Sequence, residues 1–104
     1  MAGGIVKSLQ KAVDIINCLA KNGEMGVTEL SNYFDLAKSS VYNILNTLAK
    51  NRIVEKNEIT SKYKLGLRLF ELGNIVRDRL ELREISASFM KDLVDRVEET
   101  AHSV

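Results

Sequence analysis

The side chains that could do chemistry gather between residues 38 and 64, where amides, hydroxyls and ammonium groups alternate with apolar residues. This stretch holds six basic and two acidic residues, although the whole chain has a net charge of only +1. Asparagine amides can pair with adenine through two hydrogen bonds, hydroxyls can donate to phosphates or base edges, and lysines neutralise phosphates. The composition therefore predicts that the middle of the chain meets an anionic partner, and double-stranded DNA suits these groups.

The charge is spread unevenly over the 104 residues. Residues 1–66 carry nine basic and six acidic side chains, a balance of +3, whereas residues 67–104 carry six basic and eight acidic ones, a balance of −2. For a nucleic-acid partner the distribution of charge matters more than its sum. We therefore expect the two parts of the chain to have different roles.

An enzyme, a metal site or a cofactor site finds no support in the sequence. His102 is the only histidine and has no cysteine partner at zinc spacing, and neither catalytic-triad nor phosphate-loop spacing occurs. Cys18, the only cysteine, lies on an apolar helix face, which favours a buried structural thiol over a redox role. We predict a protein that is not an enzyme and that has no cofactor.

The sequence also lacks membrane and secretion signals. Its apolar runs fall short of the roughly 18 to 20 residues that a membrane span needs, and residues 1–4 carry no basic region followed by an apolar one. The expected location is the cytoplasm, in association with the nucleoid, with no membrane partner.

Apolar periodicity predicts a first helix over residues 7–21. Its expected core face consists of residues three and four apart, backed by two more apolar residues: Leu9, Val13, Ile16 and Ala20, with Ala12 and Leu19. Asn22 and Gly23 are expected to end the helix, because both tolerate the left-handed conformation common at helix C-termini.

A short helix and a longer one follow, over about residues 29–35 and 38–51. Thr28 is expected to cap the short helix, with Glu29 favoured in its first turn by the helix dipole. The expected apolar residues are Leu30, Tyr33 and Phe34 in the short helix, and Val41, Ile44, Leu45 and Leu48 in the longer one. Two helices joined by a turn of a few residues form a helix-turn-helix.

Residues 53–65 contain two runs in which β-branched and other apolar residues alternate with polar ones. This pattern predicts a β-hairpin, the wing. The expected strands cover residues 53–56 and 59–65, and the tip lies at either Asn57-Glu58 or Thr60-Ser61, which both have turn chemistry. Lys62 and Lys64 are two residues apart and so share a strand face, with Tyr63 pointing the other way.

A linker helix is predicted over residues 67–81, after Gly66. It must pack on something, because a lone helix of this kind is unstable in water, and the simplest partner is the same helix of a second subunit. The predicted dimer-interface residues are Leu69, Leu72, Ile75, Val76 and Leu80. A further helix with Ile85, Phe89, Leu93 and Val97 is expected within residues 82–104, after a break near Glu81 to Arg83.

These elements predict a mainly α fold with a small β-hairpin. The fold is a winged helix-turn-helix, a three-helix bundle plus wing, followed by a long linker helix and a further helix. The expected division of the chain is a disordered N-terminus over 1–6, a DNA-binding domain over 7–66, the linker and dimerisation helix over 67–81, and the further helix over 82–104.

The third predicted helix is expected to enter the major groove, while the wing touches a neighbouring minor groove or the backbone. The predicted DNA-binding residues are Thr28, Lys38, Ser39, Ser40, Tyr42, Asn43, Asn46, Thr47, Lys50, Lys62 and Lys64. Tyr42 can equally be a half-buried packing residue. The alternative for the whole chain is a winged-helix protein-protein interaction module without specific DNA binding.

Three stretches resemble the N-terminal region of the isocitrate lyase regulator (IclR) family of transcription regulators. SLQKAVDIINCLAKNGEMGVTEL is similar to the family's first helix and the start of its second, and LAKSSVYNILNTLAKNRIV to its turn and recognition helix. YKLGLRLFELG is similar to its wing strand and linker helix, and LREISASFMKDLVDRVEETAHSV resembles the helix that opens its effector-binding domain.

The resemblance implies a homodimer that is held through the first and linker helices and binds a palindromic operator, with a tetramer as an alternative for the full-length protein. We expect this dimer to repress an adjacent promoter, with activation as the alternative. A small-molecule effector would be bound by the C-terminal domain, of which residues 82–104 would be the truncated beginning. Family members often have Pro, Thr and a His-Arg pair where Ala37, Ser40 and Tyr42-Asn43 stand here. The buried positions of the recognition helix are all apolar, so we expect the fold to be unchanged.

Overall fold

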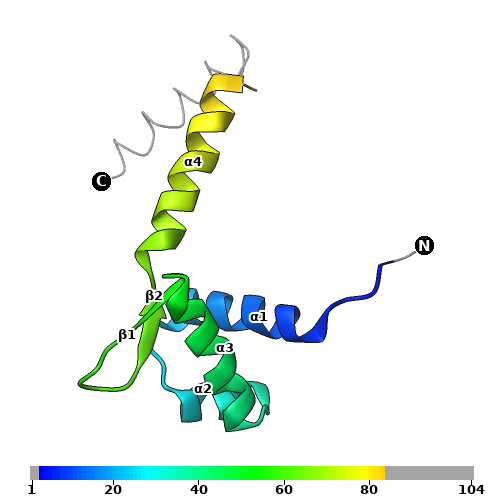
Figure 1. Cartoon of the computed structure of the whole chain (residues 1–104), viewed down its shortest axis with the longest axis vertical. Helices are drawn as coiled ribbons and strands as arrows, with labels where there is room; N and C mark the ends of the chain where they lie inside the picture. Colours follow the sequence, from blue (N-terminus) through cyan, green and yellow to red (C-terminus); the bar gives the residue numbers. More distant parts are fainter. Residues whose placement is uncertain (1–2, 84–104) are drawn as a thin grey trace. The chain divides into compact units, whose positions relative to one another are not determined.

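The computed structural model describes residues 3–83, which form four helices and one two-stranded antiparallel hairpin (Figure 1). The helices are α1 (Lys7–Asn22), α2 (Val27–Phe34), α3 (Lys38–Lys50) and α4 (Leu67–Arg83), and the strands are β1 (Val54–Lys56) and β2 (Tyr63–Leu65). This order confirms the predicted winged helix-turn-helix followed by a long helix. A further helix was expected within residues 82–104. The part of this range after Arg83 lies outside the described residues.

The chain divides into two compact units, one ending at Glu71 and the other beginning at Leu72. The core of the first unit lies where α1, α2 and α3 meet the hairpin. Its fully buried side chains come from every one of these elements: Ile15, Leu30, Val41, Leu45 and Val54. Burying a side chain of this size stabilises a fold by roughly 1.5–3 kcal/mol. Because α3 packs against α1, α2 and β1, all three hold it in place.

The predicted core face of α1 was partly wrong. Leu9 and Val13 are 63% and 43% exposed, and Ala20 is exposed as well, whereas the predicted Leu19 is buried and Ala12 and Ile16 are half-buried. The buried residues of the helix are Leu19 together with Ile15 and Cys18, which were not among the residues of the predicted core face. Both sets have the three and four residue spacing of a helix face, so periodicity alone does not choose between them. The prediction that the Cys18 thiol is buried is confirmed.

The loop after α1 is held at both ends by backbone hydrogen bonds. Gly23 adopts a φ of 80°, and its N–H donates to the Leu19 carbonyl at 2.9 Å, which confirms the predicted helix end. Met25 then pairs with Tyr63 of β2 through two backbone bonds, of 3.0 and 2.8 Å. The loop therefore adds a one-residue extended segment beside the hairpin and carries the chain to α2.

The start of α2 differs from the prediction, because Thr28 is not its cap. The helix begins at Val27, after Gly26 in an extended conformation. The Gly26 N–H donates to the Glu29 Oε1 at 3.0 Å, so the acidic side chain of the first turn satisfies this backbone donor. Thr28 lies one residue inside the helix with an exposed side chain. A glycine cap bonded by a glutamate carboxylate thus replaces the expected hydroxyl cap.

The turn between α2 and α3 is stabilised by a buried hydroxyl. Asp35 ends α2 in the left-handed conformation, with a φ of 54°. Ser31 is buried, and its Oγ donates to the Leu36 carbonyl. Tyr33, expected on the apolar side of α2, is instead 59% exposed and lies edge-on to the Phe34 ring. The hydrogen bond from this buried hydroxyl therefore holds the backbone of the turn at Leu36, just before α3 begins.

The hairpin has shorter strands than predicted. In its antiparallel register Val54 pairs with Leu65, and Lys56 pairs with Tyr63. The expected strand start at residue 59 was wrong, because residues 57–62 form one loop that contains both candidate turns. The Asn57 side-chain oxygen accepts hydrogen bonds from the backbone N–H groups of Ile59 and Thr60, and Ser61 has a φ of 60°. This turn closes the loop locally and leaves the Ile59 side chain exposed.

Gly66 joins the hairpin to α4 through a close backbone approach. Its N–H donates to the Ile53 carbonyl at 2.8 Å, and the N–H of Arg68 donates to the Arg52 carbonyl at 3.2 Å. Arg52 itself is left-handed, with a φ of 61°. A Cβ on residue 66 would overlap the carbonyl oxygen of Arg52. Only glycine therefore fits at this junction without a backbone shift.

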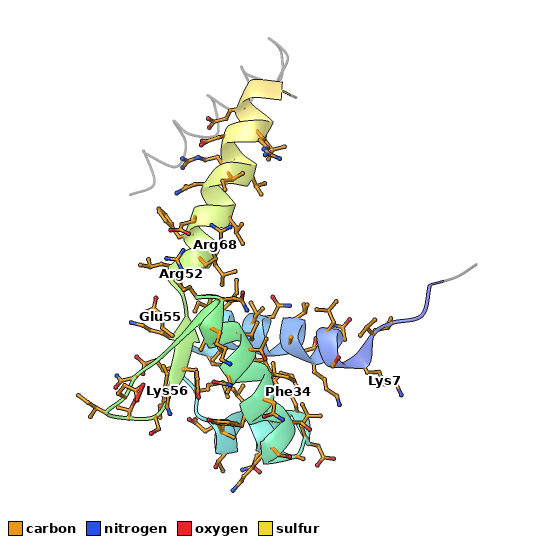
Figure 2. The ribbon with its side chains drawn as sticks, viewed as in Figure 1. Lys7, Phe34, Arg52, Glu55, Lys56 and Arg68 are labelled. Atoms are coloured by element: carbon orange, nitrogen blue, oxygen red, sulfur yellow. The ribbon has the colours of Figure 1, made fainter. Side chains whose placement is uncertain are left out.

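Charged side chains reinforce the same junction. Figure 2 labels Arg52 and Arg68 near the start of α4, and both guanidinium groups contact Glu71 Oε1, at 2.9 and 3.1 Å. The hydrogen bond from Arg68, together with the nearby charge of Arg52, lowers the pKa of Glu71 below its ordinary value of 4.5. The Leu67 N–H donates to Glu55 Oε2 at 3.2 Å, so a second carboxylate accepts from the first turn of α4.

Candidate nucleic-acid interface

The outer face of α3 is polar along its whole length. Ser39, Asn43, Asn46 and Lys50 are spaced by four, three and four residues, which places them on one side of a helix. All are exposed, while Val41 and Leu45 on the opposite side are fully buried. These four side chains, which carry one hydroxyl, two amides and one ammonium group, form a continuous surface that we call the α3 polar face.

Tyr42 lies at the edge of this face, beside a groove. Its side chain is 50% exposed, so it is neither a core residue nor a fully solvated one. The groove has a volume of about 330 Å³ and is lined by residues from the start of α2, from α3 and from both sides of the hairpin loop. They include Thr28, Glu29, Tyr42, Lys56 and Lys62. Three of the predicted DNA-binding residues, two hydroxyls and a lysine, therefore meet at one place.

Two other predicted residues lie on a different side of α3. Ser40 and Thr47 are seven residues apart and so lie on the same side of the helix, away from the centre of the polar face. The Thr47 hydroxyl donates to the Asn43 carbonyl at 2.9 Å. The backbone carbonyl of Thr47 accepts a hydrogen bond from the side-chain amide of Asn51. The proton of this hydroxyl is therefore used within the helix, which leaves its oxygen as an acceptor.

The lysines of the wing have different surroundings. Lys62 lies in the loop just before β2, with its Nζ 3.7 Å from Glu29 Oε1. Lys64 lies within β2 opposite Glu55, and its side chain is exposed. Tyr63 between them is 3% exposed, which confirms that it points the other way. The shared strand face was only partly right, because Lys62 precedes the strand.

Sequence reasoning missed two residues of this site. Lys56 of β1 pairs with Tyr63 across the hairpin and places its Nζ 6.0 Å from the centre of the tyrosine ring (labelled in Figure 2). Glu29 was read only as a first-turn acid, although it also contacts the wing. The register of the hairpin would have revealed Lys56, whereas no local pattern connects Glu29 with Lys62.

Most basic side chains of the site form no ion pair with an acidic side chain in the described part of the chain. Within residues 3–81 the ion pairs involve Arg52, Arg68, Arg77 and Lys62. Lys38 and Lys50, at the two ends of α3, take part in none of these pairs and are exposed. Positive charge is therefore available at both ends of the α3 polar face for an anionic partner.

The comparisons with known proteins agree with this geometry. Residues 8–58 match the family described as the IclR helix-turn-helix domain. The chain carries an IclR-family helix-turn-helix domain. The matched residues contain α1 from its second residue, together with α2, α3 and β1, and so include the whole α3 polar face. Proteins of this family are transcriptional regulators that bind DNA, and they are not enzymes.

The relatives are bacterial regulators. The IclR-type chain is 34% identical over 97 residues to the HTH-type transcriptional regulator KdgR of Escherichia coli, an alignment that covers 93% of this chain and 37% of the relative. It is 31% identical to the glycerol operon regulatory protein of Streptomyces coelicolor, with 93% of this chain and 39% of the relative covered. The chain thus spans less than two-fifths of the length of these curated relatives.

Solved structures of the family have the same fold. The crystal structure of IclR from Thermotoga maritima superposes with a TM-score of 0.67 at 27% identity, covering 86% of this chain and 36% of that one. The IclR-family regulator from Brucella abortus superposes with a TM-score of 0.68 at 20% identity, covering 92% and 39%. Among the helices described here, none is long and apolar enough to cross a membrane.

An apolar stripe remains exposed on the part of α4 that belongs to the second unit. Leu72, Ile75, Val76 and Leu80 are between 37% and 58% exposed, and their spacing of three and four residues places them along one side of the helix. Leu69, the remaining predicted interface residue, is partly buried in the first unit. We call Leu72, Ile75, Val76 and Leu80 the α4 apolar stripe.

Proposed function

We propose that this IclR-type chain binds a palindromic operator in double-stranded DNA as a homodimer and represses transcription from an adjacent promoter. The observation that carries the proposal is the α3 polar face, in which Ser39, Asn43, Asn46 and Lys50 are exposed together on a helix whose other side is buried. Its amides have the donor and acceptor pair that recognises adenine in the major groove. Repression is the simplest consequence, because a dimer on an operator within a promoter excludes the polymerase.

The contacts divide by chemistry. Asn43 and Asn46 are proposed to read base edges, together with Tyr42 at the edge of the face. Ser39, Ser40, Thr47 and Thr28 are proposed to contact phosphates or bases, and Lys38, Lys50, Lys62 and Lys64 to neutralise phosphates. Exposed lysines at both ends of α3 and on the wing support this division, because they surround the amide groups with positive charge.

Dimerisation is proposed to use the α4 apolar stripe. Apolar residues at three and four residue spacing would pair with the same stripe of a second subunit, and this pairing would remove their apolar surface from water. The exposed apolar side of α1, with Leu9 and Val13, offers a second surface for the partner. A symmetric pair of chains would place two α3 polar faces on two half-sites, about one helical turn of DNA apart or a multiple of it.

The remaining partners are proposed by analogy with the family. A small-molecule effector would act only through a C-terminal domain, because the chain covers less than two-fifths of the regulators it matches. Residues 82–104 are proposed to begin that domain. The proposed location is the cytoplasm at the nucleoid, where an operator is found.

The test is a fluorescence-anisotropy titration of labelled duplex DNA at several salt concentrations. The affinity of the wild type should fall steeply with salt, and Lys64→Ala should reduce the slope of log K against log salt by about one unit. Lys21→Ala, at the far end of α1, is the matched control and should leave the slope unchanged. Binding that is insensitive to salt, or equal effects of the two variants, would contradict the proposal.

Base reading is tested separately. A duplex selected from a random pool should bind far more tightly than a scrambled one, and Asn46→Ala should cost about 1–3 kcal/mol on the selected duplex only. A loss of equal size on both duplexes would assign Asn46 to phosphate contact instead.

The alternative, a protein-protein module, has one specific observation in its favour. A groove of about 380 Å³ lies between α1 and α3, with apolar walls that include Leu9, Ala12, Ile44 and Leu48. Such a surface can receive a partner side chain. The titration above separates the two functions, because a module of this kind would show no salt-dependent binding of DNA.

A further inference from the structure

An acidic side chain lies inside the groove that carries the wing lysine. Glu29 Oε1 accepts a hydrogen bond from the Gly26 N–H at 3.0 Å and is 3.7 Å from Lys62 Nζ. Both side chains line the groove together with Thr28 and Tyr42. Among the residues that line it, all within the described part of the chain, Glu29 is the only acid. A carboxylate among residues that are proposed to contact phosphates repels those phosphates.

The contact between Glu29 and Lys62 is of a kind that a stronger acceptor can replace. The two side chains are 49% and 47% exposed, and solvent screens an ion pair of this kind. The separation of 3.7 Å is longer than a charge-assisted hydrogen bond, which is about 2.7–2.9 Å. A DNA phosphate in the groove can offer Lys62 such a bond. The hydrogen bond from the Gly26 N–H is a separate contact of the same carboxylate, so it does not require Lys62.

We propose that Glu29 is an internal competitor for Lys62, which holds the wing lysine against α2 in the unbound protein and yields it to a phosphate on DNA. This inference rests on the proposed DNA-binding function. The competition has two consequences. It keeps the wing in position beside α2 before binding. It also lowers the affinity for DNA of any sequence, because the charge of Lys62 is partly neutralised before DNA arrives.

Glu29→Gln separates the charge of Glu29 from its role at the helix start. A glutamine at this position can still accept the Gly26 N–H, since glutamate and glutamine serve equally in a capping box. The variant should bind DNA about 3–10 times more tightly at low salt. Its slope of log K against log salt should equal that of the wild type, because Lys62 contacts the same phosphate in both complexes.

The experiment uses the whole chain and a fluorescein-labelled duplex of mixed sequence, titrated by anisotropy over a series of potassium chloride concentrations. The variants are Glu29→Gln, Lys62→Ala and their combination. Asp14→Asn on α1 is the control, because it removes one negative charge outside the groove, in a separate shallow pocket. The gain from Glu29→Gln should disappear in the Lys62→Ala background, and Asp14→Asn should change affinity less than twofold. Thermal melting by circular dichroism checks that each variant is folded.

The outcomes separate this inference from the function on which it rests. A wild type without salt-dependent DNA binding overturns both. A wild type that binds, with a Glu29→Gln variant that binds no more tightly, overturns only the competition. A gain that persists in full when Lys62 is alanine, or an equal gain from Asp14→Asn, assigns the effect to net charge and likewise overturns it.

Discussion

Replacing Gly66 by alanine should destabilise the helix-turn-helix domain. The effect should be larger than that of a glycine-to-alanine substitution at any other glycine of residues 3–83. The added Cβ would overlap the carbonyl oxygen of Arg52 and press on the backbone of Ile53. Neither neighbour is the flexible end of a side chain, so the backbone itself must move. The movement would also weaken the bond from the Gly66 N–H to the Ile53 carbonyl, now 2.8 Å long.

The magnitude follows from these two terms. Overpacking a rigid site costs about 1–3 kcal/mol, and a weakened backbone hydrogen bond about 1 kcal/mol more. We therefore expect Gly66→Ala to lower the free energy of unfolding by about 3 kcal/mol. For a domain of this size, that corresponds to a fall in Tm of roughly 12–24 °C.

Urea unfolding monitored by circular dichroism measures the effect, and the chain offers a matched control. Gly73 lies inside α4 with no atom within 4 Å of the position its Cβ would take. Gly73→Ala should leave the midpoint unchanged or raise stability by up to about 1 kcal/mol, because alanine is the better helix former. If Gly66→Ala changed the free energy of unfolding by less than about 0.5 kcal/mol, the close approach at the junction would be refuted.

Three further predictions concern the core, the pH response and the dimer. Leu45→Ala should cost about 2–5 kcal/mol in urea unfolding, because this side chain is fully buried. The pKa of Glu71 is lowered in the folded state, so its contribution to stability is present above its ordinary value of 4.5 and is lost as the pH falls through the lower folded value. The urea midpoint of the wild type should therefore fall more steeply with acid below about pH 4.5 than that of Glu71→Gln. In sedimentation, the wild type should be a dimer at micromolar concentration and Leu72→Asp a monomer, because a carboxylate in the α4 apolar stripe would lose its hydration on pairing.

Each of the three has a control that can contradict it. Leu67 is 65% exposed, and Leu67→Ala should cost less than about 0.5 kcal/mol. Similar losses at residues 45 and 67 would contradict the burial argument. If the wild type and Glu71→Gln were equally sensitive to acid, the hydrogen bond from Arg68 to Glu71 would not stabilise the fold. Asn74→Asp introduces the same charge off the α4 apolar stripe, and a wild-type monomer, or dissociation by this control, would argue against pairing through the stripe.

Elements whose signals are local could be predicted from the sequence. The third helix is an example, because Val41 and Leu45 repeat at helical spacing and amide and hydroxyl residues fill the opposite side. The structure gives it the bounds Lys38–Lys50, one residue short of the expected end. The hairpin was predicted for the same reason, since alternation and turn chemistry are properties of neighbouring residues. The order of helices, wing and linker helix, and thus the fold class, therefore followed from the sequence alone.

The tertiary structure decided what depends on residues far apart in the chain. Leu9 and Ile15 both belong to stripes of helical spacing, and only the packing of α1 against α3 and β2 buries the second. Glu29 meets Lys62 because the loop before α2 pairs with β2, a contact that no local pattern announces. Gly66 is needed because the backbone of Arg52 passes within contact distance. The sequence by itself determined which elements form, since short-range spacing sets them, and the fold decided which face of each is buried and which charges meet, since those depend on partners brought together only by folding.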